Sequence, residues 1–209
     1  MYQELIKYLR ILKRQANRFE RTNINNEVDE SFKAKYLVKT VFVIISVGFV
    51  FLLKDGFNDS FVSYVSSVLS ILVGLFITAL IFSFDKFYEP SKEENLNSRI
   101  KLWETQAYNY AKKFAYITSY TIVISIFTLV ILVLSAMFKK ETRVNIFELS
   151  FCIECISIND FNWLKLFGIS LFVAIQRFLV LYWLLRIMYY TLFIVSSMVQ
   201  YMTTKIDRK

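Results

Sequence analysis

Residues 61–84, FVSYVSSVLSILVGLFITALIFSF, contain no charged side chain. As an α-helix this stretch has roughly six turns, which is long enough to cross a hydrocarbon core of about 30 Å. Three further stretches are apolar with few charges, at residues 36–53, 115–138 and 164–202. Core helices of soluble proteins are shorter and keep a polar face, and hydrophobic residues make up 56% of this chain, so a water-soluble fold is disfavoured. The sequence therefore predicts an all-α, polytopic membrane protein with four transmembrane helices.

The distribution of positive charge predicts the orientation of these helices. Lysine and arginine are concentrated in residues 1–35, in the loop between the second and third apolar stretches, and in the tail after residue 202. Because cytoplasmic loops of membrane proteins are enriched in these residues, we expect a multi-pass protein of the plasma (inner) membrane with both termini in the cytoplasm. This topology and attraction to anionic lipid explain the net charge of +8, so direct nucleic-acid binding is not expected.

The expected topology divides the chain into six segments. No glycine or proline interrupts the residues between Pro90 and Phe138, so the third transmembrane helix is expected to continue into the cytoplasm as an unbroken stalk. The fourth apolar stretch is too long for one crossing, but its only glycine, Gly168, lies near its start, which favours one protruding helix over a hairpin. The segments are 1–35, a cytoplasmic amphipathic basic helix and linker; 36–84, transmembrane helices 1 and 2; 85–114, the cytoplasmic stalk helix; 115–138, transmembrane helix 3; 139–163, an extracytoplasmic loop; and 164–209, transmembrane helix 4 with a cytoplasmic extension.

Two cytoplasmic segments carry narrow apolar seams at spacings of three and four residues, which is typical of helices that pack against a partner. The first helix could lie on the inner leaflet with its basic face toward lipid headgroups, or it could pack against another helix of the same assembly. The matching seam on the stalk favours a cytoplasmic helical bundle, within one subunit or between subunits. The seam residues are Leu5, Leu9, Leu12 and Phe19 in the first helix, and Leu96, Ile100, Trp103 and Tyr110 in the stalk.

Three polar residues of the fourth apolar stretch are candidates for a functional role within the membrane. Gln176 and Arg177 are placed near the middle of the bilayer, and Arg186 is placed near its inner end. A charged side chain at mid-depth costs at least about 2.5 kcal/mol on insertion scales and usually turns to a partner, a carbonyl or water. Arg177 could therefore line a water-filled path or form a switchable pair, or its long stem could extend toward an interface.

Small residues recur along two of the apolar stretches. Such stripes allow close approach of helix backbones and hydrogen bonding between helices, which favours packing within the subunit. The alternative is a polar-lined pore assembled from several subunits. The stripes comprise Ser66, Ser70, Gly74 and Thr78 in the second stretch and Thr121, Ser125 and Thr128 in the third.

Cys152 and Cys155 lie in the loop expected outside the membrane. A redox C-x-x-C site needs a surrounding domain that this loop is too short to supply, so a structural disulfide is favoured. The alternation of apolar and polar residues around the two cysteines indicates a short strand on the membrane surface or a contact surface for an external molecule.

The absence of histidine bears on catalysis. It excludes Ser-His and Cys-His nucleophiles and metal centres built on imidazole. The four glycines form no phosphate-binding loop or dinucleotide fingerprint. We therefore expect no enzyme activity, no catalytic residue, no cofactor and no metal site.

Two functions of different class fit these features. The first is an oligomeric inner-membrane platform that senses an envelope event and engages a soluble cytoplasmic protein through its helical bundle. The second is a pore-forming effector, in effect an ion channel, that dissipates the membrane potential. A pore would turn Arg177 and the hydroxyl stripes toward a central axis, whereas a platform would bury them inside each subunit.

The layout of four spans, two cytoplasmic termini and cytoplasmic helical extensions resembles the small membrane subunits of bacterial anti-phage defence systems. It is most similar in organisation to the membrane subunits of the Kiwa type. The resemblance covers the whole chain but includes no diagnostic motif, so it assigns no functional residue. It implies a homo-oligomer that senses phage at the envelope and acts with a soluble DNA-binding partner.

Overall fold

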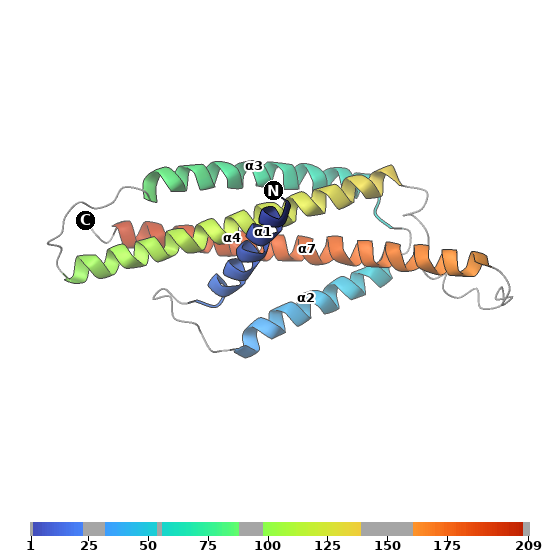
Figure 1. Ribbon diagram of the computed structural model, residues 1–209, viewed down its shortest axis with the longest axis horizontal. Coiled ribbons are helices and arrows are strands. Elements are labelled where there is room, and N and C mark those ends of the chain that lie inside the picture. Colours follow the sequence, from blue (N-terminus) through green and yellow to red (C-terminus); the bar gives the residue numbers. More distant parts are fainter. Residues whose placement is uncertain (1, 23–31, 54–55, 88–97, 139–160, 207–209) are drawn as a thin grey trace. The chain divides into compact units, whose positions relative to one another are not determined.

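The computed structural model describes residues 2–22, 32–53, 56–87, 98–138 and 161–206. Within these ranges the secondary-structure elements are all helices, and no strand is present (Figure 1). The prediction of an all-α fold is therefore confirmed. The five helices are α1 (Tyr2–Phe19), α2 (Phe32–Leu52), α3 (Asp59–Phe87), α4 (Ser98–Met137) and α7 (Phe161–Ile206).

Three helices have the length and apolar composition required to cross a membrane. The qualifying segments are Asp59–Ser83 of α3, Thr105–Met137 of α4 and Phe167–Val199 of α7. The apolar part of α2, Tyr36–Leu52, is shorter than these three. Helix geometry and composition thus support the second, third and fourth expected spans, and leave the first as a shorter apolar helix.

Both long helices are continuous. Helix α4 is a single helix of 40 residues, so the expected stalk and the third apolar stretch are joined without a break from Ser98 onward. Helix α7 extends over 46 residues, or roughly 70 Å at 1.5 Å per residue, which confirms one helix instead of a hairpin.

A tight turn connects α2 to α3. Gly56 has a positive φ of 79°, a conformation that glycine adopts without a steric penalty. The carbonyl of Asn58 accepts the first hydrogen bond of α3 from the N–H of Val62, at 3.0 Å, and asparagine is a preferred residue at this N-cap position. Asp59 in the first turn complements the positive end of the helix dipole.

The chain divides into two compact units, each with its own core. Unit 1 comprises Met1–Tyr36, Leu72–Ile124 and Ile187–Lys209, and unit 2 comprises Leu37–Ile71 and Ser125–Arg186. In unit 1 the buried apolar side chains come from α1, α3, α4 and α7, and in unit 2 from α3, α4, α7 and the turn before α3. They are Ala16, Phe19, Phe76, Tyr110, Ala111, Phe114, Ile117, Tyr120, Ile124, Ile187, Tyr190 and Ile194 in unit 1, and Phe57, Leu69, Leu132, Val173 and Val180 in unit 2.

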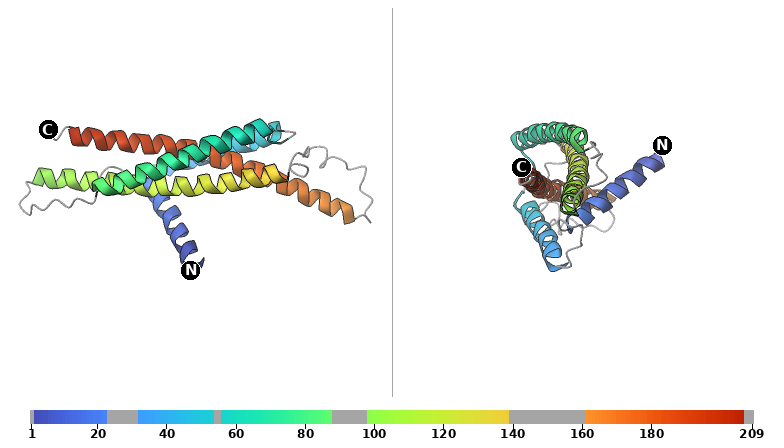
Figure 2. Two further views of the ribbon diagram at one scale, coloured as in Figure 1. Left: turned by 90° about the horizontal axis from the view of Figure 1, so that it is seen from above. Right: turned by 90° about the vertical axis from the view of Figure 1, so that its left-hand side faces the viewer.

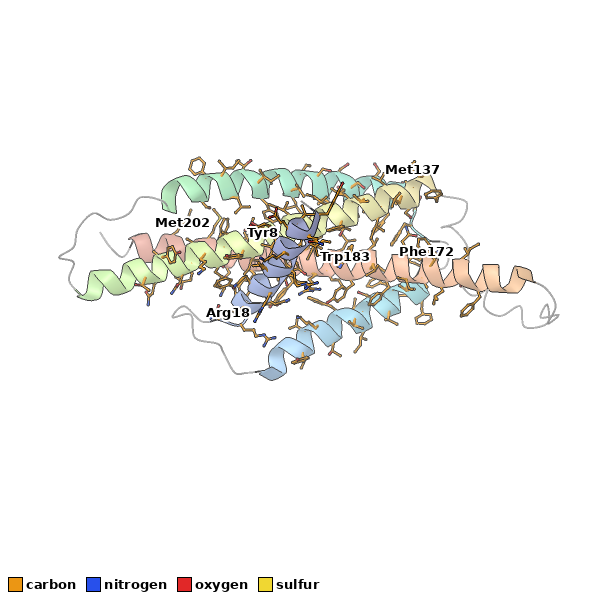
Figure 3. The ribbon with its side chains drawn as sticks, viewed as in Figure 1. Tyr8, Arg18, Met137, Phe172, Trp183 and Met202 are labelled. Atoms are coloured by element: carbon orange, nitrogen blue, oxygen red, sulfur yellow. The ribbon has the colours of Figure 1, made fainter. Side chains whose placement is uncertain are left out.

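Polar and apolar side chains are distributed opposite to the pattern of a soluble protein. Large apolar residues such as Met137, Phe172 and Met202 are more than half exposed (Figure 3). The buried polar residues in the described helices include arginines, serines and threonines. Contiguous apolar surface on this scale marks contact with lipid or protein, so the arrangement supports a bilayer around the helices.

Candidate functional site

Two buried polar arrangements stand out, one in each unit. The first, in unit 2, surrounds the guanidinium of Arg177 on α7 and is called the guanidinium centre. The second, in unit 1, surrounds the ammonium of Lys113 on α4 and is called the α1 clamp. Each consists of a cationic side chain that donates to the backbone carbonyl of a residue just beyond the end of a helix.

The guanidinium centre links α7 to the end of α2. Arg177 is only 2% exposed, and its Nη1 donates a hydrogen bond of 2.8 Å to the carbonyl oxygen of Leu53. The same oxygen accepts a longer bond of 3.4 Å from the N–H of Gly56. Carbonyls at a helix C-terminus lack intrahelical partners and carry partial negative charge, so the guanidinium complements the end of α2. A charged side chain in the membrane is expected to turn to a partner, a carbonyl or water, and the structure shows Arg177 bonded to a backbone carbonyl.

Two fully buried serines accompany the guanidinium centre in unit 2. Ser46 on α2 and Ser125 on α4 are both 0% exposed. Neither hydroxyl oxygen hydrogen-bonds to any part of the chain that the structure describes, and the same holds for Oε1 of Gln176 beside Arg177. A buried polar atom without a partner is destabilising, so these groups make the interior of unit 2 less stable than an apolar one.

Replacing Ser46 with alanine should leave stability unchanged or raise it by up to about 1 kcal/mol, because the substitution removes a buried hydroxyl that makes no hydrogen bond within the described helices. Thr121→Val is the matched comparison, since the Thr121 hydroxyl donates to the Ile117 carbonyl at 2.8 Å, and a loss of about 0.5 kcal/mol is expected there. Unfolding by SDS in mixed micelles measures both. A clear loss of stability in Ser46→Ala would show that this hydroxyl has a stabilising partner.

Arg186 lies at the end of unit 2 and is 9% exposed, so it is also buried. Aromatic side chains line the preceding turns of α7. Trp183 lies 6.4 Å from Phe127 of α4 between ring centroids, and Tyr182 stacks on Phe178 at 5.9 Å. Two of the three intramembrane polar residues singled out from the sequence, Arg177 and Arg186, are therefore enclosed by the chain itself.

The two small-residue stripes have opposite environments. On α4, Thr121, Ser125 and Thr128 are 0% exposed. On α3, Ser66 is half-buried, whereas Ser70, Gly74 and Thr78 are exposed. The stripe of α4 faces the interior of the chain, and the stripe of α3 faces outward.

The exposed stripe of α3 is satisfied by its own helix. The hydroxyls of Ser70 and Thr78 donate to the carbonyls of Ser66 and Gly74, at 2.8 and 2.9 Å. A Cβ atom placed on Gly74 would meet nothing within 4 Å. This face is therefore open and apolar enough for lipid or for another helix.

The α1 clamp joins the end of α1 to α4, and α4 to α7, within unit 1. The Phe19 ring stacks on Tyr116 of α4, with centroids 5.5 Å apart and planes at 22°. Nζ of Lys113 donates to the Thr22 carbonyl at 3.1 Å and lies 4.6 Å from the centroid of Phe193 on α7. The clamp thus combines an aromatic contact, a hydrogen bond just after the end of α1 and a cation–π contact.

Only the C-terminal end of the α1 seam is covered by the chain. Phe19 is 4% exposed, Leu9 and Leu12 are half-buried, and Leu5 is 60% exposed. On the stalk, Tyr110 is buried at 5% exposure. Leu96 lies outside the described residues, and Ile100 and Trp103 lie on α4 with side chains outside the description.

The sequence patterns missed the residues of the clamp other than Phe19. Lys113 follows Lys112 directly, and nothing in their types distinguishes the half-buried Lys113 from the exposed Lys112. Thr22 lies beyond the end of α1, where the helical spacing no longer applies. The expected disulfide and strand at Cys152 and Cys155 lie outside the described residues.

The chain matches no family model, no curated protein and no solved structure. Its function is therefore argued from the geometry of the two units.

Proposed function

We propose that the protein is a non-enzymatic platform of the inner membrane that responds to an event at the cell envelope, such as phage infection, and engages a soluble cytoplasmic protein. Four helices cross the bilayer, both termini face the cytoplasm, and several copies associate. The observation that carries this proposal is the enclosure of polar side chains of α4 and α7 within a single chain, with the end of α1 clamped against α4.

The apolar part of α2 supports a fourth span. Tyr36–Leu52 would be about 26 Å long, close to the thickness of the hydrocarbon core. Outward-facing side chains such as Ile44, Phe49 and Leu52 are 63%, 48% and 75% exposed, which suits lipid. Arg177 donates a hydrogen bond to the Leu53 carbonyl just after the C-terminal end of this helix. A carbonyl at a helix end needs such a partner in an apolar medium.

Burial of the α4 hydroxyls and Arg177 favours the platform over the pore. A water-filled path lined by these groups would require them at an axis between subunits, but Thr121, Thr128 and Arg177 are each 2% exposed or less in one chain. The Thr121 hydroxyl donates to the Ile117 carbonyl of its own helix, and Arg177 donates to the Leu53 carbonyl at the end of α2, so neither group needs a water-filled lumen.

One observation favours the alternative, a pore-forming effector. The Ser70, Gly74 and Thr78 face of α3 is exposed and carries hydroxyls. Several copies with α3 at a common axis would place these hydroxyls along a lumen. This version of a pore depends on α3 instead of α4 and α7.

Flux through liposomes tests the proposal directly. The purified full-length chain, reconstituted without any partner, is expected to leave both a potassium gradient and an entrapped dye intact, because Arg177 and the hydroxyls of the α4 stripe are enclosed. A leak that scales with the protein-to-lipid ratio would overturn the platform and support the α3-lined pore. Empty liposomes taken through the same detergent removal serve as the control.

Self-association through α3 makes a separate prediction. Gly74→Ile should reduce cross-linked oligomers in native membranes several-fold, because the added side chain separates backbones that approach at glycine. Leu75→Ile is the matched control, since Leu75 is 60% exposed and adjacent but lies off the stripe. The single chain tolerates the change at Gly74, where a Cβ meets nothing within 4 Å. Equal cross-linking of both variants would exclude this face from the interface.

A further inference from the structure

The amino-terminal part of α1, residues 2–12, is an amphipathic surface that the rest of the described chain covers only in part, at Leu9 and Leu12. Tyr2, Leu5 and Ile6 share one side of the helix and are 80%, 60% and 56% exposed. Farther along the same side, Ala16 and Phe19 are buried at 0% and 4%. One continuous apolar face is thus covered at its end by the α1 clamp and uncovered at its beginning.

The clamp fixes where this surface lies along α4, and therefore its depth relative to the membrane. Lys112 and Lys113 of α4 are followed by residues 114–138, which contain no charge. Lys113 and Tyr116, which hold the end of α1, therefore lie where the charged part of α4 gives way to its membrane-spanning part. Within unit 1, α1 leaves α4 and α7 at a steep angle instead of running alongside them (Figure 2). A helix held at this level and inclined steeply to a spanning helix lies along the membrane surface.

The charges of α1 complement an anionic surface. Lys7, Arg10 and Arg14 lie on the side of the helix opposite to Leu5, and all three are exposed. The helix contains a single acidic residue, Glu4, in its first turn. A second copy of α1 packed on the apolar side would leave these basic side chains without a partner of opposite charge. A layer of anionic headgroups above an apolar core matches both sides of the helix.

We propose that residues 2–12 of α1 bind the anionic phospholipid surface of the inner leaflet, with Tyr2, Leu5 and Ile6 in the acyl boundary and the basic side chains among the headgroups. This inference rests on the membrane-spanning arrangement proposed above, but not on the partner protein or on the absence of conductance. The clamp holds one end of α1 on the helix bundle, and lipid holds the other.

Site-specific quenching in the full-length protein tests this binding. A fluorophore is attached at Ile6→Cys on the apolar side, or at Glu4→Cys on the opposite side as the matched control, with Cys152→Ser and Cys155→Ser in both. In vesicles containing phosphatidylglycerol, the label at position 6 should be quenched by nitroxide carried on lipid chains and shielded from iodide. The label at position 4 should be open to iodide and little affected by the lipid nitroxide.

Charge should control the result. The double substitution Lys7→Glu and Arg10→Glu is expected to weaken the bound state by at least tenfold, since each basic residue near an anionic surface contributes about a fivefold factor. Raising the salt concentration should also weaken binding of α1 in the protein without these substitutions. This comparison needs no substitution in the basic face, so an effect of the two glutamates on folding cannot explain it. Vesicles of phosphatidylcholine alone should show much weaker lipid quenching at position 6.

Two outcomes would overturn the inference. Equal exposure of positions 4 and 6 to iodide in phosphatidylglycerol vesicles would show that α1 is away from the lipid. Shielding of position 6 from iodide without lipid quenching would show that protein covers this face. Because the potassium and dye assays report conductance separately, failure of lipid binding by α1 is distinguishable from failure of the platform.

Discussion

Arg177→Ala is expected to lower the free energy of unfolding by about 3 kcal/mol. Arg177 is 2% exposed and donates to the Leu53 carbonyl at 2.8 Å, so truncation removes a charge-assisted hydrogen bond and leaves a cavity. The Leu53 oxygen would retain only the 3.4 Å bond from Gly56. SDS-induced unfolding in mixed micelles measures the loss, and amide hydrogen exchange near the end of α2 should show where the structure opens.

Two further substitutions separate the charge from the volume. Arg177→Met keeps most of the apolar stem, and a loss of about 2 kcal/mol is expected because the carbonyl loses its charged donor. Arg177→Lys keeps the charge without the planar fork and should fall between methionine and arginine. Buried charges can also be replaced by apolar residues at no loss of stability. If Arg177→Met were as stable as the unsubstituted protein, the hydrogen bond from the guanidinium to the Leu53 carbonyl would make no net contribution to stability.

The helices themselves follow closely from the sequence. The uncharged run at 61–84 lies within α3, whose N-cap at Asn58 and turn at Gly56 supply ordinary local signals. The absence of proline and of a central glycine from 164–202 is enough to predict one long α7. These features are local along the chain, so pattern and spacing reveal them.

The partners of the polar residues do not follow from the sequence. Arg177 is an obvious candidate in an apolar run, but it donates to the backbone carbonyl of Leu53. Every residue has such a carbonyl whatever its side chain, so the sequence does not single out Leu53. The stripes of α3 and α4 have similar composition but opposite burial. A serine or threonine can bond to its own helix, as Ser70 does to Ser66, so a hydroxyl facing outward carries little penalty. Composition therefore cannot assign the side that each stripe faces.

Phe19→Ala is expected to release α1 from the α1 clamp. Phe19 is 4% exposed and stacks on Tyr116, and truncation of a buried phenylalanine typically costs about 3 to 5 kcal/mol. Local opening of α1 should become on the order of 100-fold more frequent, because a loss of this size acts on the docking of one helix and leaves the other helices folded. Limited trypsin digestion in detergent micelles, where anionic lipid makes no contribution, should show faster cleavage after the arginines of α1.

Tyr8→Ala is the matched control because Tyr8 is an aromatic residue of the same helix but is 68% exposed, and cleavage should change little. Lys113→Met removes the hydrogen bond to the Thr22 carbonyl and the contact with Phe193, so cleavage should rise less than in Phe19→Ala. Combining Phe19→Ala with Lys113→Met should add little beyond Phe19→Ala alone, since both act on the same end of α1. Cleavage rates that are unchanged in Phe19→Ala would mean that the clamp does not hold α1, and the platform would then have to present this helix free in the cytoplasm.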